Sequence, residues 1–218
     1  MASSPLISRK RLKQALLFLM AVLICFMGVF WFFSSKNKNQ DLTEYEAYLE
    51  KTVGPKIQLG DWVLREGTGY ESQLIKQLSG SHYSHIGVVS QVKPTIQIIH
   101  ATTDDDPEHP NQVIVSSLAE FTQTKWANSW AIYRNTSLAP KQINESLHSL
   151  HQSVGQNFVI DVKENNPKYC TTIIYDSLPI SMQSQLLWKQ VSLTIMKGEM
   201  LFPNAFIELK DTKLIYRK

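Results

Sequence analysis

The sequence predicts an α+β fold, in which one N-terminal transmembrane helix precedes a globular domain with a central antiparallel sheet or small barrel and packed helices. Three observations predict this organisation. Residues 15–33 carry no charged or strongly polar side chain. Beyond residue 57, strand-like alternation and helix-like periods follow each other in short segments. The chain has 218 residues and is 43% hydrophobic, which is enough for one substantial core.

The apolar segment 15–33 predicts a signal anchor. As a helix it nearly matches a hydrocarbon core of about 30 Å. Basic residues are more frequent before it than after it, which favours a cytoplasmic N-terminus and a domain on the other side of the membrane. A cleaved signal peptide is the alternative, although no small-x-small cleavage site follows residue 33. The expected divisions are a basic N-terminus over 1–14, the helix over 15–33, a linker with a short helix over 34–56, and one domain over 57–218.

Charge argues against a nucleic-acid partner. The chain has 22 basic and 19 acidic residues, but four of the basic residues precede the apolar segment. Without those four, the remainder is close to neutral, so no phosphate-binding field is expected. These four residues are Arg9, Lys10, Arg11 and Lys13.

Short periodic segments predict the elements of the domain. Leu42, Tyr45, Leu49 and Val53 fall at helical spacing, so a short helix is expected over 41–53. A capping box of Ser117 and Glu120 opens a further helix. In chain order we expect strands over 60–65, 85–92, 95–100, 112–116, 130–134 and 157–162, and helices over 72–78, 117–124, 140–154 and 171–178.

Two histidines fall on the adjacent strands of one predicted hairpin. If the hairpin is symmetric about its Val92-Lys93 turn, His85 faces His100, and their Cβ atoms lie about 4.5–5.5 Å apart. The two rings would then touch. A turn centred one position later would instead pair His85 with Thr102.

Cys170 is the second candidate for chemistry. It is the only cysteine outside the apolar segment, so the domain cannot close an internal disulfide. It also stands at the start of a predicted helix, where the macrodipole favours the thiolate. A lone cysteine is more often a small buried apolar residue. Its position at a loop-to-helix junction and the available histidines favour a nucleophile instead.

Five motifs in one order resemble the circularly permuted papain-like cysteine hydrolases of the NlpC superfamily. The similarity covers about residues 58–206 and is strongest to the YiiX/YebB-like bacterial group, with lecithin:retinol acyltransferase-like proteins as more distant relatives. The motifs are Gly60-Asp61-Trp62-Val63, Tyr83-Ser84-His85-Ile86-Gly87-Val88-Val89, Ile98-Ile99-His100-Ala101, Val113-Ile114-Val115-Ser116-Ser117-Leu118-Ala119-Glu120-Phe121 and Tyr169-Cys170-Thr171.

The resemblance implies a permuted papain-like domain with roles for three residues. Cys170 maps onto the nucleophile, His85 onto the general base and His100 onto the residue that orients the base. One of the acids in 104–108 is an alternative to His100. Asp61 matches a position that looks structural. Tyr83, Tyr169 and His82 are candidates for contact with the substrate or oxyanion, beside the backbone amide of Cys170. No cofactor and no metal are expected.

The sequence therefore predicts a membrane-anchored cysteine hydrolase that cleaves an amide or ester through a thioester. The expected location is the bacterial inner membrane, with one membrane pass and the catalytic domain on the periplasmic side. The expected substrate is a cell-wall peptide or a lipid-like acyl compound. Two alternatives stay open: acyl transfer at the same site, or a tethered module that binds cell-wall or lipid components without catalysis. The oligomeric state is unknown.

Overall fold

The computed structural model describes residues 20, 23–24, 27, 41–193 and 196–218. The chain divides into two units, residues 1–44 and 45–218. Most of the predicted transmembrane helix over 15–33 lies outside the described residues, so that prediction is untested. Among the described residues, no helix is long and apolar enough to cross a membrane.

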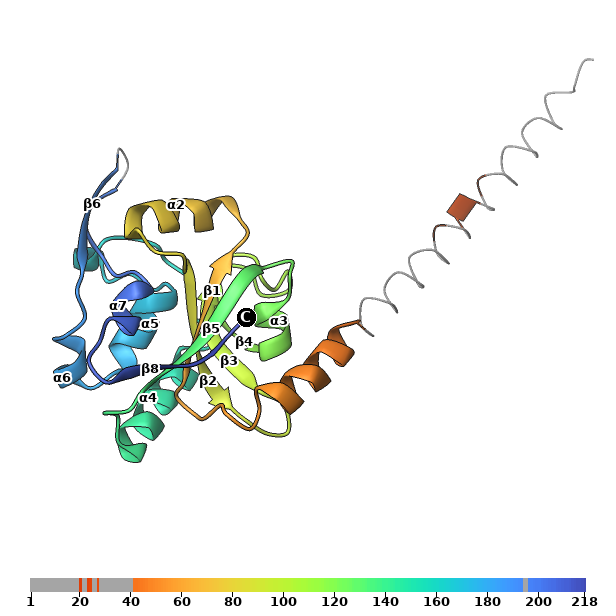
Figure 1. Ribbon diagram of the computed structural model, residues 1–218. Helices are drawn as coiled ribbons and strands as arrows, with labels where there is room; N and C mark the ends of the chain where they lie inside the picture. Colours follow the sequence, from red (N-terminus) through yellow and green to blue (C-terminus); the bar gives the residue numbers. More distant parts are fainter. Residues whose placement is uncertain (1–19, 21–22, 25–26, 28–40, 194–195) are drawn as a thin grey trace, which may run out of the picture. The chain divides into compact units, whose positions relative to one another are not determined.

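A six-stranded antiparallel sheet forms the centre of the second unit (Figure 1). Its strand order is β4-β3-β2-β1-β5-β8, with β4 and β8 as the outermost strands. The predicted antiparallel sheet and the α+β class are therefore confirmed. The strands are β1 (Trp62–Gly67), β2 (His85–Gln91), β3 (Gln97–Thr102), β4 (Gln112–Ser117), β5 (Ala127–Asn135) and β8 (Thr212–Arg217).

Helices cover both faces of the sheet, and residues 45–52 are also helical. Figure 1 shows α4 and α5 on one side of the strands and α3 on the other. The labelled helices are α2 (Tyr70–Ser79), α3 (Leu118–Thr122), α4 (Pro140–Ser153), α5 (Cys170–Ser177), α6 (Ile180–Gln183) and α7 (Asn204–Ile207), with a 3-10 turn η1 (Lys163–Asn165).

The α5 side of the sheet holds the main hydrophobic core. Alternation along the strands sends every second side chain to this side. Ile173 and Ile174 of α5 belong to the same buried cluster as Trp62, Leu64 and Ile86. Cys170 also belongs to it.

The strand side chains that alternate with those of the hydrophobic core point to the α3 side of the sheet. Arg65 of β1 pairs in register with His85 of β2, and both contact Phe121 of α3. The predicted capping box fixes the start of α3, because the Ser117 hydroxyl accepts from the Glu120 amide while the Glu120 carboxylate accepts from the Ser117 amide. Phe121 is fully buried against this face.

The register between β2 and β3 shows that the alignment with His85 directly opposite His100 is wrong. Val88 pairs with Ile99 and Val89 with Ile98, so the hairpin follows the later turn position. Gly87, and not His85, therefore lies across from His100. The two histidines occupy diagonal positions on one face, where long side chains still reach each other.

Several elements near the C-terminal end depend on tertiary pairing, and no element after residue 178 was predicted. β6 (Lys189–Leu193) and β7 (Met196–Met200) form a separate antiparallel pair, and β8 adds to β5 at the sheet edge. The predicted strand over 157–162 is wrong. Asn157 and Val159 make only isolated bridges, to Gln112 and Lys168.

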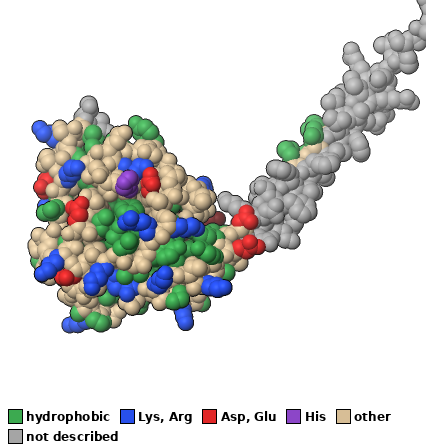
Figure 2. All heavy atoms as spheres, in the orientation of Figure 1, with side chains coloured by type: hydrophobic (Ala, Val, Ile, Leu, Met, Phe, Trp, Pro, Cys, Tyr) green, Lys and Arg blue, Asp and Glu red, His purple; other side chains and the backbone are tan. Residues whose placement is uncertain are grey.

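Charged side chains are distributed over the visible surface. Figure 2 shows Lys and Arg side chains spread across this face, and apolar side chains gathered near its middle. On this face the basic residues do not form one continuous strip.

Candidate active site

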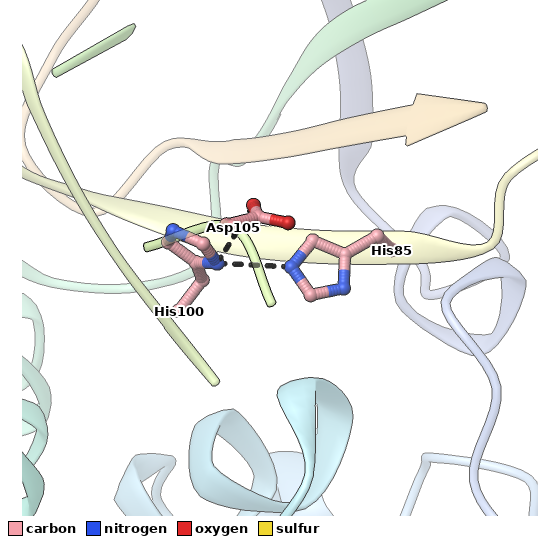
Figure 3. Close-up of side chains that lie close together, drawn as sticks. All are labelled: His85, His100 and Asp105. Carbon is pink, nitrogen blue, oxygen red and sulfur yellow. Dashed lines mark hydrogen bonds and ion pairs between the residues drawn. The ribbon is translucent and has the colours of Figure 1, made fainter. Parts of the chain in front are cut away.

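Two imidazoles and a hydroxyl form a hydrogen-bonded chain on the α3 side of the sheet. His85 Nε2 lies 3.0 Å from His100 Nδ1, and His100 Nε2 lies 3.0 Å from Ser116 Oγ. Figure 3 shows His85 and His100 directed toward each other from neighbouring strands, with Asp105 beside them. The predicted contact between the histidines is thus present, although the two residues are diagonal neighbours on β2 and β3 and do not lie directly across from each other.

The proton positions along this chain have two consistent arrangements. In the first, His85 donates from Nε2 to His100, and His100 donates from Nε2 to Ser116, which leaves a lone pair on His85 Nδ1. In the second, the Ser116 hydroxyl donates to His100 Nε2 and His100 Nδ1 donates to His85 Nε2, so His85 Nδ1 carries the proton. His85 Nδ1 has no hydrogen bond to another described residue. In the first arrangement this nitrogen is a free base.

The surroundings keep both rings neutral. Burial is the main cause that holds the pKa of His85 well below its ordinary value of 6.5, and the positive charge of Arg65 and the neighbouring His100 lower it further. The pKa of His100 is lowered in the same way, by burial first and by Arg65 second. His100 is fully buried, whereas His85 is half-buried and borders a pocket. Neutral imidazoles can take up protons but do not supply a positive charge.

An ion pair lies next to the imidazoles. Arg65 Nη2 is 2.7 Å from Asp105 Oδ2, and the two side chains are only 6% and 7% exposed. Arg65 Nη1 donates to the Phe121 carbonyl at 2.9 Å, and the guanidinium lies over the Phe121 ring. Asp105 Oδ2 is 3.9 Å from His100 Nδ1. The acid expected near His100 is therefore present as Asp105, but its main partner is Arg65.

Cys170 stands at the first residue of α5, as predicted. The start of this helix is fixed by Thr172, whose hydroxyl accepts from the Tyr169 amide at 2.9 Å and donates to the Pro167 carbonyl. Thr171 bonds to the Leu201 carbonyl at 2.8 Å. These contacts hold the loop-to-helix junction in one position and leave the thiol 6% exposed.

The predicted effect of the helix on the thiol is reversed by burial. Burial raises the pKa of Cys170 to about 11, while the backbone amides of Ile86, Thr171 and Cys170 and the charge of Arg65 act in the opposite direction. A position at a helix N-terminus favours the thiolate, but here the loss of solvent is the larger effect. The resting site thus holds a neutral thiol.

A pocket of about 320 Å³ brings the thiol and the base together. Cys170, His85, Arg65 and Asp105 all line it. Its remaining lining is partly apolar, with Ile75, Tyr70, Trp126, Phe158 and Ile160, and partly acidic, with Glu71 and Asp104.

Cys170 and His85 do not form a hydrogen bond in the described part of the chain. On β2, the backbone of Ile86, the residue that follows His85, forms a hydrogen bond with the sulfur that lowers the pKa of Cys170. Ile86 belongs to the α5 face, whereas the His85 ring contacts Phe121 on the α3 face. The thiol and the imidazole therefore reach the pocket from the two sides of β2.

The predicted substrate contacts separate into two places. Tyr169 lines the pocket of Cys170, and its hydroxyl accepts from the Leu201 amide at 2.9 Å. His82 and Tyr83 instead line a second pocket of about 490 Å³ together with Glu66 and Arg217. Burial, with Tyr133 beside it, raises the pKa of Tyr83 to about 12. His82 and Tyr83 are thus not part of the lining around the thiol.

Asp61 has the structural role that was expected. It is buried and accepts from Arg134 Nε and Nη2 at 2.6 and 2.7 Å, and from the Gln58 amide at 2.8 Å. These bonds join the start of β1 to β5. Asp61 is not among the residues that line the pocket of Cys170.

Ligand atoms of His85, His100 and Asp105 all lie within 4.8 Å of one another, so their types and spacing suit a metal ion. The surrounding contacts do not. Asp105 is already paired with Arg65, whose permanent positive charge would repel a cation, and the facing imidazole nitrogens share a hydrogen bond. As they are arranged, the three residues do not fit a metal site.

The sequence interpretation missed Arg65, Ser116 and Phe121. A signal existed for Arg65, because it is a charged residue that ends the apolar run Trp62-Val63-Leu64. A charge in a buried strand needs a partner. No local pattern marks Ser116 or Phe121, since they reach the histidines only through strand pairing and the docking of α3.

Comparisons with known proteins identify the fold. No protein-family model matches the sequence, and no curated protein matches it. Among solved structures, the chain is similar to that of the metalloprotein YiiX from Escherichia coli O157:H7, with a TM-score of 0.60. The match has 14% sequence identity and covers 75% of this chain and 98% of that one. The predicted resemblance to the YiiX-like group is confirmed at the level of the fold.

Proposed function

We propose that this protein is a cysteine hydrolase that cleaves an amide or ester bond through a thioester on Cys170. One observation carries the proposal: Cys170 at the start of α5 and His85 at the start of β2 line the same pocket. The order of these residues and the YiiX-like fold support it. His100 is proposed as the residue that orients His85.

The reaction begins with both groups neutral. As the Cys170 sulfur attacks the acyl carbon, its proton passes to His85 Nδ1 and the carbonyl becomes an oxyanion. The backbone amide of Cys170 is the proposed donor to this oxyanion. When the intermediate collapses, the bond to the leaving nitrogen or oxygen breaks, and His85 returns the proton to the leaving group.

Water completes the cycle. His85 removes a proton from the water as it attacks the thioester carbon, and the sulfur leaves and regains a proton. Because burial and, after it, the charge of Arg65 disfavour an imidazolium at His85, the protonated base is a strong acid and transfers its proton readily. This environment supports the return of the proton in each half of the reaction.

Substrate binding must bring the sulfur and His85 Nδ1 together, because they do not bond directly in the free protein. Both residues already line the same pocket, which is where the proposed approach takes place. Catalytic hydrogen bonds are often loose in an enzyme without substrate and tighten when it binds. The free geometry is therefore compatible with the proposal.

The lining of the pocket supports the proposed substrate class. Its apolar and aromatic lining suits an acyl chain or an apolar side chain, and its acidic residues suit a substrate with an amino group. Cell-wall peptides and lipid-like acyl compounds both fit this description. We also propose that the segment 15–33 anchors the domain on the extracytoplasmic side of the bacterial inner membrane, which would bring both substrates within reach.

Trapping of the acyl intermediate tests the proposal. The full chain with Cys25→Ser keeps Cys170 as its only thiol. It would be incubated with cell-wall peptides, acyl esters and phospholipids, and analysed by mass spectrometry for product and for an acyl adduct on Cys170. Loss of product and adduct in Cys170→Ala is expected. Turnover that survives in this variant would refute the proposal, and a protein that binds these compounds without turnover would be the non-catalytic module.

The similar structure from Escherichia coli is described as that of a metalloprotein. We propose no metal mechanism here, because the positive charge of Arg65, 2.7 Å from Asp105 Oδ2, opposes the binding of a cation at this carboxylate. No step of the proposed reaction passes through a metal.

A further inference from the structure

Arg65 is a buried cation within the pocket of Cys170. It lies on β1 in register with His85, and it is 5% exposed. Among the residues that line this pocket, it is the single Lys or Arg. A cation is costly to bury unless it compensates negative charge.

The fixed partners of Arg65 leave part of its guanidinium unused. Nη1 donates to the Phe121 carbonyl and Nη2 to Asp105. Nε is buried and has no hydrogen-bond partner among the described residues. An unpaired buried donor is uncommon and costs free energy. Negative charge that forms near this group during function would offset that cost.

The two imidazoles cannot fill this role in the resting protein. Papain-like chemistry can use an imidazolium to stabilise the thiolate, but here both rings are held neutral by burial and by Arg65 itself. Arg65 acts on Cys170 in the opposite sense, because its charge favours the thiolate. In the resting protein, the positive charge beside the thiol therefore comes from the guanidinium of Arg65 and not from an imidazolium.

We infer that Arg65, held by Asp105 and Phe121, is the built-in cation that stabilises negative charge on the Cys170 sulfur. Arg65 is a positioning and electrostatic residue, since it acts on the thiol through space. Asp105 orients Arg65 and partly cancels its charge. The reactivity of the thiol is therefore set by the balance between Arg65 and Asp105.

Other charged and titratable groups lie around the same pocket, so the test must separate any effect of theirs from that of Arg65. They come from α2, β2, β3, the loop after β3 and the residue before α5. These groups are Glu71, His85, His100, Asp104, Asp105 and Tyr169.

The inference predicts opposite effects for two partners in one ion pair. Arg65→Met removes the cation and should shift the apparent pKa of Cys170 upward by about one unit, which slows alkylation at pH 8 about tenfold. Asp105→Asn removes the competing anion but keeps an oxygen that accepts from Nη2, so the pKa should fall and alkylation should accelerate. Arg65→Lys keeps the charge and should retain most of the parent rate.

The experiment follows iodoacetamide alkylation of Cys170 against pH in the full chain with Cys25→Ser. Urea unfolding of each variant verifies that it is folded; if Arg65→Met does not fold, the opposite shift in Asp105→Asn still decides the question. A merely structural ion pair would make both substitutions change the thiol in the same direction. Such parallel changes, or an unchanged profile in folded Arg65→Met, would overturn the inference.

This inference rests on the proposed site, but its test does not depend on turnover. Alkylation measures the thiol without any substrate. If Cys170 proves unnecessary for hydrolysis while the two variants still shift its pKa in opposite directions, the proposed function fails and the electrostatic role stands. If turnover needs Cys170 but the Arg65 and Asp105 variants do not change its alkylation, the proposed function stands and the electrostatic role fails.

Discussion

Gly87 lies beside His100 on the neighbouring strand, and its missing side chain allows the two strands to approach closely at this point. A Cβ built at Gly87 would be 3.1 Å from His100 Cβ and 2.5 Å from Ile98 Cγ2. A side chain at position 87 would therefore crowd Ile98 and His100 on β3.

Gly87→Ala should destabilise the domain because the new methyl group overpacks the space between β2 and β3. The expected loss is about 1–3 kcal/mol in the free energy of unfolding, measured by urea denaturation. Gly69→Ala is the matched control, since a Cβ there meets nothing within 4 Å, and it should change stability by less than about 0.5 kcal/mol. Equal stability of the two variants would contradict this account of Gly87.

His100→Leu should reduce kcat/KM by about 10–100-fold, because His85 would lose the acceptor that holds its Nε2 proton. His100→Gln retains a side-chain oxygen and should recover part of this loss. The comparison uses whichever acyl substrate the trapping experiment identifies. If both variants keep the full rate, His100 does not orient His85.

The stability of the domain should decrease as the pH falls below about 6.5. In the unfolded chain both histidines take up protons near that pH, but in the folded chain their pKa values are far lower. The unfolded state then binds more protons, so each ring lowers the free energy of unfolding by up to about 1.4 kcal/mol per pH unit.

Urea unfolding between pH 8 and pH 5 measures this effect. The double variant His85→Gln, His100→Gln lacks both titrating rings and should show a shallower loss over the same range. An identical slope in the parent and the double variant would assign the acid sensitivity to other groups.

Asp61→Asn should lower stability and leave chemistry intact. Asp61 is 1% exposed and accepts from Arg134 and the Gln58 amide, so replacing its charge weakens a buried network by about 1–3 kcal/mol. Asp176→Asn, which weakens the exposed Lys168 pair, should cost less than about 1 kcal/mol. Unfolding and kcat of the folded fraction are measured for both. A large loss of kcat with unchanged stability would give Asp61 a chemical role.

Chelation should not alter the thiol site. Because Arg65 holds Asp105 at 2.7 Å, treatment with EDTA is expected to leave both the alkylation rate of Cys170 and the unfolding midpoint unchanged. A change in either property that zinc restores would show that an ion displaces Arg65 from Asp105.

The sequence was sufficient for most of the local elements before residue 178. Residue alternation identified β1, β2, β3, β4 and β5, helical spacing identified α2, α4 and α5, and the Ser117 capping box identified the start of α3. These signals are local, since each depends on a few neighbouring residues. The same reasoning placed Cys170 at a helix start and His85 at a strand start, and the order of the motifs indicated the YiiX-like fold.

The tertiary structure decided the properties that depend on residues distant in the chain. It selected the register that sets Gly87 beside His100, paired Arg65 with Asp105, and placed Tyr83 and His82 in a different pocket from Cys170. It also reversed the expected effect on the thiol, because the helix position is encoded locally whereas the loss of solvent is not. Burial is produced by the packing of the whole domain, so the charge state of Cys170 could not be obtained from the sequence around it.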